Sequence, residues 1–337
     1  SQAFQIGDAT VSKLTDVEAF LSNLGVWLEG APERIELWGG EPFVYWAKLK
    51  RLIPALAERF PEAQFLIITN GSLLTREKLD LITEYDIDIG LSHDGPGQGQ
   101  RGPDPLEDLE QRRWIEVLLA ERKGHVSINT VLTAQNHDLE AIKAWFQKRL
   151  GLDVPISLEG VVNVYDAATL LGAGRFEEAD LHALRRSVFE SLVSDPGSFG
   201  LDKRVRDFIQ SLKVRRPIEA LGQKCGMDRP EHIAVDLRGN VMTCQNTGAK
   251  GEHKIGHVDD FDAIALDTAT HFAFREECMS CPVVQLCKGS CMFLEGEFFK
   301  QSCANEFAFN MGIMMAAVWH LTGMVVVGVE GSGSPFS

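Results

Sequence analysis

Apolar residues in the first half of the chain alternate between short continuous runs and longer stretches with helical spacing. Short runs of this kind are typical of buried strands, and they fall at residues 34–38, 65–69, 87–92, 125–132 and 155–162. The stretches with helical spacing lie before and between them, at residues 15–29, 43–60, 72–85, 105–122 and 138–150. This alternation predicts parallel βαβ units joined by right-handed crossovers, and therefore an α/β fold.

Each predicted strand in this part of the chain ends in a polar turn. Gly39 and Gly40 follow the first strand, Asn70 and Gly71 follow the second, and residues 93–96 follow the third. In parallel α/β proteins the active site lies at the carboxyl ends of the strands. The pattern therefore predicts a functional site at this edge of the sheet before any motif is considered.

The second half of the chain has a different pattern. Two further helices are predicted at residues 177–193 and 201–212, and beyond residue 221 the apolar runs become short and all the cysteines appear. Residues 307–329 contain no charged residue, but the break at 320–323 predicts a buried helix and then a strand at 324–329, not a membrane span. We therefore divide the chain into an α/β domain, a helical connector, a cysteine-rich domain and a C-terminal helix and strand, at residues 1–175, 176–220, 221–305 and 306–330.

Composition narrows the functional classes. The chain has 48 acidic and 33 basic residues, a formal net charge of -15, which argues against general nucleic-acid binding. Hydrophobic content of 45% is typical of a globular protein, and no secretory signal is recognisable near Ser1. We expect a cytoplasmic protein that does not enter membranes. The basic residues at 203–216 indicate either an exposed helix face or a docking site for an acidic leader peptide.

The seven cysteines carry the strongest chemical signal. They form the pattern C-x18-C with Gly239 five residues before the second cysteine, and then C-x2-C-x5-C-x3-C-x11-C. A C-x2-C pair can place two thiolates on one metal ion or one iron–sulfur cluster. A zinc site would need a second such pair, whereas seven thiolates suit two iron–sulfur clusters as four plus three. The cysteines are Cys225, Cys244, Cys278, Cys281, Cys287, Cys291 and Cys303.

These motifs together resemble the radical S-adenosylmethionine (SAM) enzymes that carry a SPASM domain. The cysteine spacing resembles the SPASM motif. Gly39-Gly40-Glu41-Pro42 resembles the family's GGEP motif, residues 69–71 its T-N-G, and residues 91–96 its S-L-D-G-P, with His93 in place of leucine. The resemblance covers residues 30–305. It implies a partial (β/α)6 TIM-like barrel, here with the first strand apparently missing, followed by a small cysteine-rich iron–sulfur SPASM domain.

The resemblance also implies roles for individual residues. The GGEP segment would hold the amino group of SAM through backbone carbonyls and Glu41, Ser92 would contact the SAM carboxylate, and Asn129 would line the same pocket. Cys278, Cys281, Cys287 and Cys303 would bind one [4Fe-4S] auxiliary cluster. Cys225, Cys244 and Cys291 would bind a second one, leaving an iron with an open or non-cysteine ligand.

One departure from the family pattern concerns the catalytic cluster. The family binds it with C-x3-C-x2-C before GGEP, and here the residues before Gly39 contain no cysteine and no strand pattern. Loss of a strand would bare the edge of its neighbour. An incomplete N-terminus would explain both absences, with a third [4Fe-4S] cluster on the missing segment. The alternative is a relative without that cluster, which would act as a binding scaffold.

Acid–base residues are less clearly indicated. Asp94, Glu159 and Asp236 lie near predicted strand ends, where each is either a turn-capping residue or a catalytic acid or base. Sulfatase-type maturases carry a catalytic aspartate directly after the cysteine that closes G-x4-C, and this chain has Gln245 there. That difference weakens a sulfatase-maturing interpretation.

The leading hypothesis is an enzyme that modifies a peptide or protein side chain. The resemblance implies reductive SAM cleavage, hydrogen abstraction by a deoxyadenosyl radical, and two auxiliary clusters that accept an electron or ligate the substrate. It also implies an external electron donor of the flavodoxin or ferredoxin type. A small-molecule substrate and a non-enzymatic SAM- or peptide-binding scaffold are the alternatives.

Overall fold

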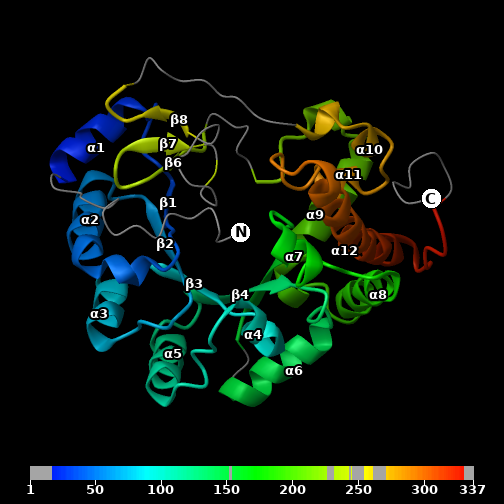
Figure 1. The fold of residues 1–337 in the computed structure, drawn as a ribbon, viewed down its shortest axis with the longest axis horizontal. Helices are drawn as coiled ribbons and strands as arrows, with labels where there is room; N and C mark the ends of the chain where they lie inside the picture. Colours follow the sequence, from blue (N-terminus) through cyan, green and yellow to red (C-terminus); the bar gives the residue numbers. More distant parts are fainter. Residues whose placement is uncertain are drawn as a thin grey trace. The chain divides into compact units, whose positions relative to one another are not determined.

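The structure, a computed structural model, describes residues 17–151, 154–225, 231–242, 244, 254–260 and 271–329 (Figure 1). These residues form two compact units. The described residues of 1–92, 104–128 and 230–267 make up the first unit, and those of 93–103, 129–229 and 268–337 make up the second. The domain division predicted from the sequence differs from these units, and it stays a prediction.

The main element is a five-stranded sheet with the strand order β1-β2-β3-β4-β5. β1 pairs with β2 and β2 with β3 in parallel. Ile67 on β2 and Ile89 on β3 are almost fully buried, as the continuous apolar runs predict. The predicted parallel α/β fold is confirmed. The strands are β1 (Arg34–Leu37), β2 (Gln64–Thr69), β3 (Asp88–Ser92), β4 (Val126–Leu132) and β5 (Ile156–Val161).

Helices alternate with these strands along the chain, as predicted. Asp108 and Asp138 accept hydrogen bonds from backbone N–H groups in the first turns of two of the helices, and so fix where these helices begin. Two short helices, α4 (Gln98–Arg101) and α7 (Ala167–Leu171), were not predicted. The others are α1 (Val17–Val26), η3 (Pro42–Tyr45), α2 (Trp46–Arg59), α3 (Arg76–Glu84), η4 (Gly95–Gly97), α5 (Leu109–Glu121) and α6 (Leu139–Leu150).

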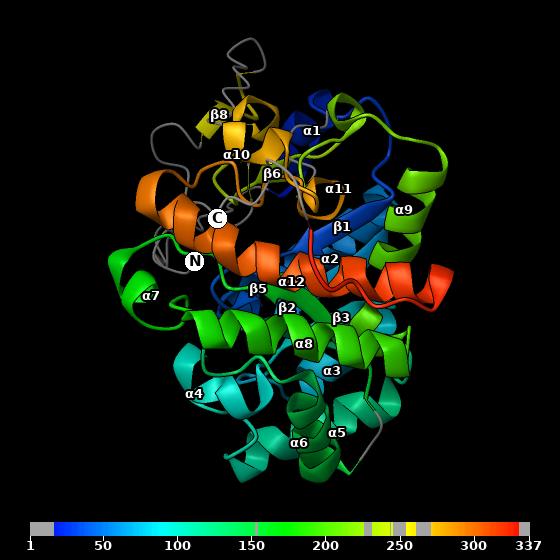
Figure 2. The ribbon, with the colours of Figure 1, turned by 90° about the vertical axis from the view of Figure 1, so that its right-hand side faces the viewer.

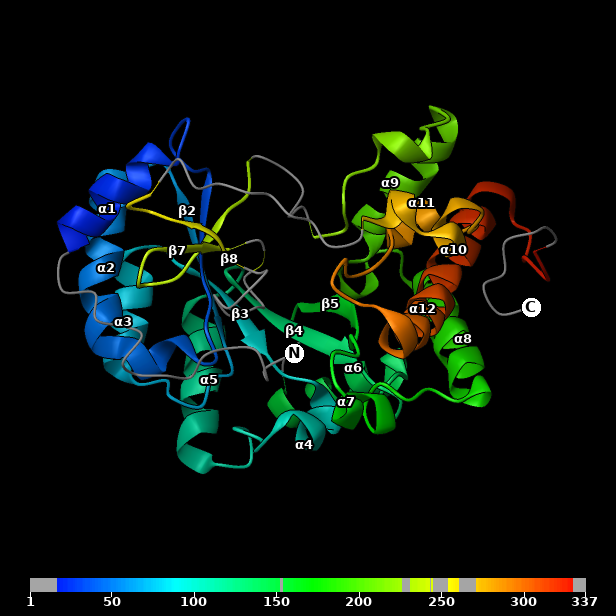
Figure 3. The ribbon, with the colours of Figure 1, turned by 45° about the horizontal axis from the view of Figure 1, so that its top comes forward.

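The first unit contains a second, antiparallel sheet that was also not predicted. It consists of β6 (Ala234–Val235), β7 (Asn240–Met242) and β8 (Lys254–His257). Its apolar face packs against residues of α1 and the turn that follows it (Figure 3). Gly239 in the β6–β7 turn has φ +90°, and a Cβ there would lie 2.5 Å from Val258. Only glycine fits this position. That explains the glycine of the G-x4-C spacing.

The second unit is mainly helical outside the sheet. α8 and α12 lie side by side (Figure 2), and at their contact a Cβ on Gly312 would lie 2.7 Å from the Arg185 carbonyl oxygen. The glycine therefore permits close helix packing. The helices of this unit are α8 (Glu178–Ser194), η5 (Ser198–Gly200), α9 (Asp202–Lys213), η6 (Ile218–Ala220), η9 (Phe272–Phe274), α10 (Glu276–Met279), α11 (Val284–Cys287) and α12 (Gly296–Thr322).

The C-terminal helix and strand differ from prediction. α12 begins at Gly296, well before the apolar run at 307. It therefore continues through the domain boundary that was predicted between residues 305 and 306. It ends at Gly323, which has φ +71° and caps the last turn. The predicted strand at 324–329 is wrong, because these residues form no strand and are mostly exposed. An apolar run forms a strand only where a neighbouring strand supplies hydrogen-bond partners. No described helix has the length and apolar character that a membrane span requires.

Candidate functional site

The GGEP turn connects the carboxyl end of β1 to η3. Gly39 and Gly40 are exposed, and Glu41 caps the short helix by accepting a hydrogen bond from the Phe43 N–H at 3.1 Å. The same Oε1 accepts from Thr69 Oγ1 at 2.8 Å, while Oε2 accepts from the Asn70 N–H at 2.8 Å. Glu41 therefore ties the turn after β1 to the turn after β2. This contact joins the GGEP and T-N-G motifs of the sequence.

One acceptor position of the Glu41 carboxylate remains available to a ligand. Burial raises the pKa of this carboxyl, and the hydrogen bonds from Asn70, Thr69 and Phe43 offset part of the rise. An ionised carboxylate offers about four acceptor positions. Three of them are occupied, which leaves one on Oε2 for an ammonium group.

The other two predicted SAM contacts lie at strands β3 and β4. Ser92 is the last residue of β3 and is half-buried, in the first unit with the GGEP turn. Asn129 lies on β4 in the second unit, where its Nδ2 donates to Glu159 Oε1 at 3.3 Å. Each of these residues thus lies on a strand of the main sheet. Their contact with SAM stays a prediction.

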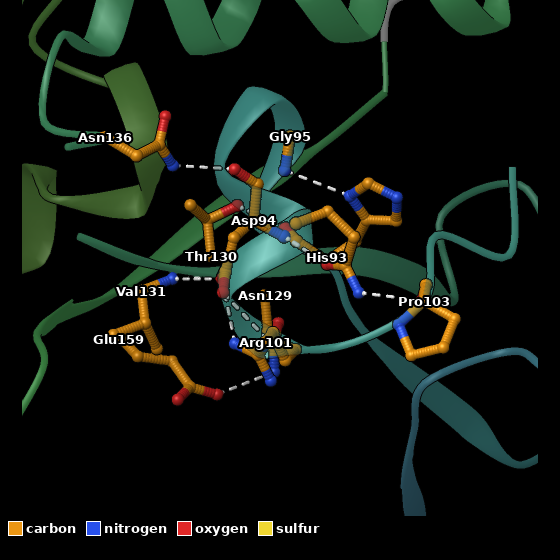
Figure 4. Close-up of polar contacts among 11 residues, drawn as sticks. His93, Asp94, Gly95, Arg101, Pro103, Asn129, Thr130, Val131, Asn136 and Glu159 are labelled. Carbon is orange, nitrogen blue, oxygen red and sulfur yellow. Dashed lines mark hydrogen bonds and ion pairs between the residues drawn. The ribbon is translucent and has the colours of Figure 1, made fainter. Parts of the chain in front are cut away.

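Asp94, a candidate acid or base, is held by a dense set of polar contacts (Figure 4). Arg101 donates to both carboxylate oxygens at 2.8 Å, and the Val131 N–H donates to Oδ1 at 2.9 Å. Asp94 is only 4% exposed. Burial alone would lower the pKa of Arg101, but the bonds to Asp94 raise it. This geometry favours a structural role in which Asp94 fixes the turn after β3 to β4.

His93, which replaces leucine in the S-L-D-G-P pattern, is also enclosed. Its side chain is fully buried, Nδ1 accepts from the Gly95 N–H at 2.9 Å, and the ring packs against Trp145 and Phe146. From the turn after β4, Asn136 Nδ2 donates to the Asp94 carbonyl at 2.7 Å. The histidine therefore stabilises the turn by packing and one hydrogen bond.

Glu159 differs from the other two carboxylates. Its side chain is exposed to solvent, yet partial desolvation raises the pKa of its carboxyl, an effect that Arg101 and the Asn129 hydrogen bond reduce. By contrast, Asp236 accepts hydrogen bonds from the N–H groups of Arg238 and Asn240 and caps the β6–β7 turn. Glu159 thus combines access to solvent with a raised carboxyl pKa, as a catalytic acid or base requires.

Four cysteines line one apolar cavity in the second unit. The volume of the cavity, about 350 Å³, includes space that is open to solvent. Its four cysteines are the set that the resemblance assigns to one cluster: Cys278, Cys281, Cys287 and Cys303. Glu277, Gly289, Ser290 and the apolar Val283, Val284, Phe299 and Phe307 complete the lining. Among the described residues, no three His, Cys, Asp or Glu side chains converge on the position of a single metal ion.

Burial affects the chemistry of these thiols. It raises the pKa of Cys278 to about 11 and that of Cys303 to about 12, and it raises the pKa of Cys281 and, far more, of Cys287. A thiolate is the ligand form, and a metal that compensates its charge would replace the proton. Four thiols in one apolar cavity are the donor set that an iron–sulfur cluster requires.

The loop between Cys287 and Cys291 has unusual backbone geometry. Lys288, Gly289 and Ser290 have φ values of 51°, 71° and 56°, all in the left-handed region. Such strain costs on the order of 1 kcal/mol or more for each non-glycine residue and persists only where the surroundings enforce it. Gln223 contributes to this enforcement, because its Nε2 donates to the Ser290 carbonyl at 2.6 Å, and Arg275 holds the segment that follows by donating to the carbonyls of residues 292 and 294.

The second predicted ligand set is less well defined. Cys225 and Cys291 belong to the second unit and Cys244 to the first, so their assembly stays a prediction. Cys225 is exposed, and the Tyr165 hydroxyl donates to Cys291 Sγ at 3.2 Å. Gln245 lies outside the described residues. Arg101 and Tyr165 were missed by the sequence analysis because neither belongs to a recognisable spacing, although Arg101 follows the S-x-D-G-P turn closely.

Comparisons with known proteins give one relative in sequence and several in structure. No family model matches the chain. It is 20% identical over 275 residues to the radical SAM cyclopropyl synthase TigE of Paramaledivibacter caminithermalis, covering 77% of this chain and 54% of that protein. The chain thus spans about half the length of the curated relative it matches.

Solved structures of anSMEcpe have the same fold. Native anSMEcpe with bound AdoMet matches with a TM-score of 0.62 at 17% identity, covering 89% of this chain and 90% of that one. The complex of anSMEcpe with AdoMet and the Cp18Cys peptide matches with a TM-score of 0.62 at 18% identity, over 90% of each chain. These comparisons confirm the resemblance of this chain to the radical SAM/SPASM enzymes, in sequence through the cyclopropyl synthase and in fold through anSMEcpe.

Proposed function

We propose that this protein is a radical SAM enzyme that modifies a peptide or protein side chain and carries two auxiliary iron–sulfur clusters. The observation that carries the proposal is the cavity lined by Cys278, Cys281, Cys287 and Cys303. Cys225, Cys244 and Cys291 would hold the second cluster. The structural likeness to anSMEcpe, solved with bound peptides, supports a peptide substrate.

The residues of the chain have distinct parts in this proposal. When bound, SAM and the iron–sulfur clusters supply the radical and one-electron chemistry. Glu41 and the exposed Gly39-Gly40 backbone would hold the amino group of the SAM methionine moiety, and Ser92 its carboxylate. Glu159 would take or give a proton near the carboxyl ends of β4 and β5. An external protein of the flavodoxin or ferredoxin type would supply electrons.

The two-cluster part of the proposal is tested by metal content. We expect the chain, reconstituted anaerobically, to bind about 8 iron atoms, the content of two [4Fe-4S] clusters. The Cys278→Ser/Cys281→Ser variant should retain about 4, because only the second ligand set stays complete. About 12 iron atoms per chain, or zinc in place of iron, would contradict the assignment.

Substrate class is tested separately by binding. Isothermal titration should detect SAM binding to the reconstituted chain, and a photo-crosslinking peptide library should label the protein. Labelling by small-molecule probes with none by peptides would contradict the peptide-modifying proposal.

A further inference from the structure

A group of buried and half-buried charged side chains lies next to the cysteine cavity. Its centre is Glu306 on α12, which is 1% exposed and one turn beyond Cys303. Lys224 Nζ donates to Glu306 Oε1 at 2.6 Å, and Asn310 Nδ2 donates to Oε2 at 2.9 Å. Both oxygens of the carboxylate are therefore engaged by donors from the protein.

Arg204 on α9 adds a second positive charge to this group. Its guanidinium lies over the Phe309 ring, 5.5 Å from the centroid, and donates to the Glu159 carbonyl oxygen at 2.9 Å. The neighbouring Arg206, by contrast, forms an exposed ion pair with Asp202. The sequence pattern treats these arginines as one basic run, but the structure separates the exposed Arg206 from the half-buried Arg204.

The group lies between β5 and the cysteine cavity. Gly160 on β5 faces the ion pair, and a Cβ at that position would lie 3.6 Å from Lys224 Nζ and 3.7 Å from Glu306 Oε1. Lys224, Glu306 and Arg204 also lie within electrostatic range of the buried Cys287. Charges at such positions act strongly, since little water screens them.

The charges in this group do not cancel. Two half-buried cations face one buried carboxylate, and a surplus of positive charge in a partly desolvated site favours an anion close to it. Four thiolates around an iron–sulfur cluster would supply that anion. The surplus charge and the predicted cluster thus complement each other in one low-dielectric region.

We propose that Arg204 and Lys224, partly balanced by Glu306, set the reduction potential of the cluster held by Cys278, Cys281, Cys287 and Cys303. The inference rests on the proposed function, which supplies that cluster. A fixed positive charge stabilises the additional electron of the reduced cluster and so raises the potential, while a fixed negative charge lowers it. Arg204 also donates a hydrogen bond to the Glu159 carbonyl, so the position of the guanidinium depends on the C-terminal half of β5.

Two substitutions with opposite expected signs test this. The measurement is an anaerobic redox titration monitored by electron paramagnetic resonance, in a Cys244→Ala background that leaves only the four-cysteine set complete. Arg204→Gln removes a positive charge while retaining an amide donor for the Glu159 carbonyl, and should shift the potential to more negative values. Glu306→Gln removes the negative charge and should shift it to more positive values.

Matched variants separate charge from loosened packing. Arg204→Lys keeps the charge and should retain a potential near that of the parent, and Lys213→Gln, exposed on the same helix, should leave it unchanged. If cluster content is intact but the reduction potential shifts in the same direction in Arg204→Gln and Glu306→Gln, or does not shift, the inference is overturned. A parent protein without iron at these cysteines would instead overturn the proposed function.

Discussion

The three candidate carboxylates of this protein differ in their hydrogen-bond partners and in their access to solvent. Asp94, Glu159 and Asp236 all follow or precede strand ends in the sequence, and nothing in the sequence separates them. The structure gives Asp94 three donors and Asp236 a turn to cap, while Glu159 retains access to solvent. Partners that come from other elements, such as Arg101 and Val131 for Asp94, are set by tertiary structure and are not readable from local sequence.

Removal of the Asp94 charge should destabilise the fold. Asp94→Asn leaves Arg101 without its buried partner, and breaking such a pair costs about 3 kcal/mol of unfolding free energy. Urea denaturation of the apo-protein measures the loss. The control is Asp80→Asn, which breaks an exposed ion pair with Arg76 and should cost less than about 1 kcal/mol. Equal effects of the two substitutions would contradict a structural role for Asp94.

A second substitution at this scale tests the GGEP turn as a ligand site. A Cβ on Gly39 would meet only the Pro42 nitrogen, at 3.9 Å, so the fold itself accommodates Gly39→Ala. We expect unchanged stability together with at least tenfold weaker SAM binding, since close approach of the ligand to the backbone requires glycine. Isothermal titration provides the affinity, and Gly30→Ala, in open space, is the control. Wild-type affinity in Gly39→Ala would place SAM elsewhere.

At the scale of elements, the sequence predicts what local periodicity determines. The five strands of the main sheet and the longer helices between them occur within a few residues of their predicted bounds. The failures share a physical cause. The β6–β8 sheet depends on a turn at Gly239 and on packing against α1, and the apolar residues 324–329 lack a pairing strand among the described residues. Neither condition is visible in a window of a few residues.

The loop between Cys287 and Cys291 offers an element-scale prediction. At Gly289, φ is +71° and a Cβ would lie 2.1 Å from the Phe272 Cβ. Gly289→Ala should therefore displace the loop and reduce iron content by about one cluster, or about 4 iron atoms. Gly296→Ala is the matched control, because its φ of +54° is also left-handed but no atom lies within 4 Å. It should cost about 1 kcal/mol of stability and no iron. Similar iron loss in both variants would show that backbone strain alone is responsible.

For the whole molecule, spacing in the sequence and convergence in space agree for one ligand set. The four cysteines assigned by resemblance to one cluster come from α10, the turn after it, α11 and α12, and they line a single cavity. The sequence could group them because the family spacing encodes the result of folding. It could not foresee the charged residues around them, since Arg204, Lys224 and Glu306 are brought together from three separate segments.

The unequal ligand sets lead to a prediction for the whole protein. Cys303 is on α12, which packs along α8, so the proposed cluster would connect the cysteine loops to the helical part of the second unit. Cys225 is exposed and belongs to the set with three cysteines. We therefore expect Cys303→Ala to reduce the soluble yield of folded protein more than Cys225→Ala does, when both are purified anaerobically side by side. Loss of Cys303 would remove a ligand from a buried site, and the charge of the remaining thiolates would no longer be compensated by a complete cluster. Loss of Cys225 would alter a site near the surface. Iron content should fall in both variants. A larger loss of folded protein for Cys225→Ala, or equal losses, would overturn the four-plus-three assignment.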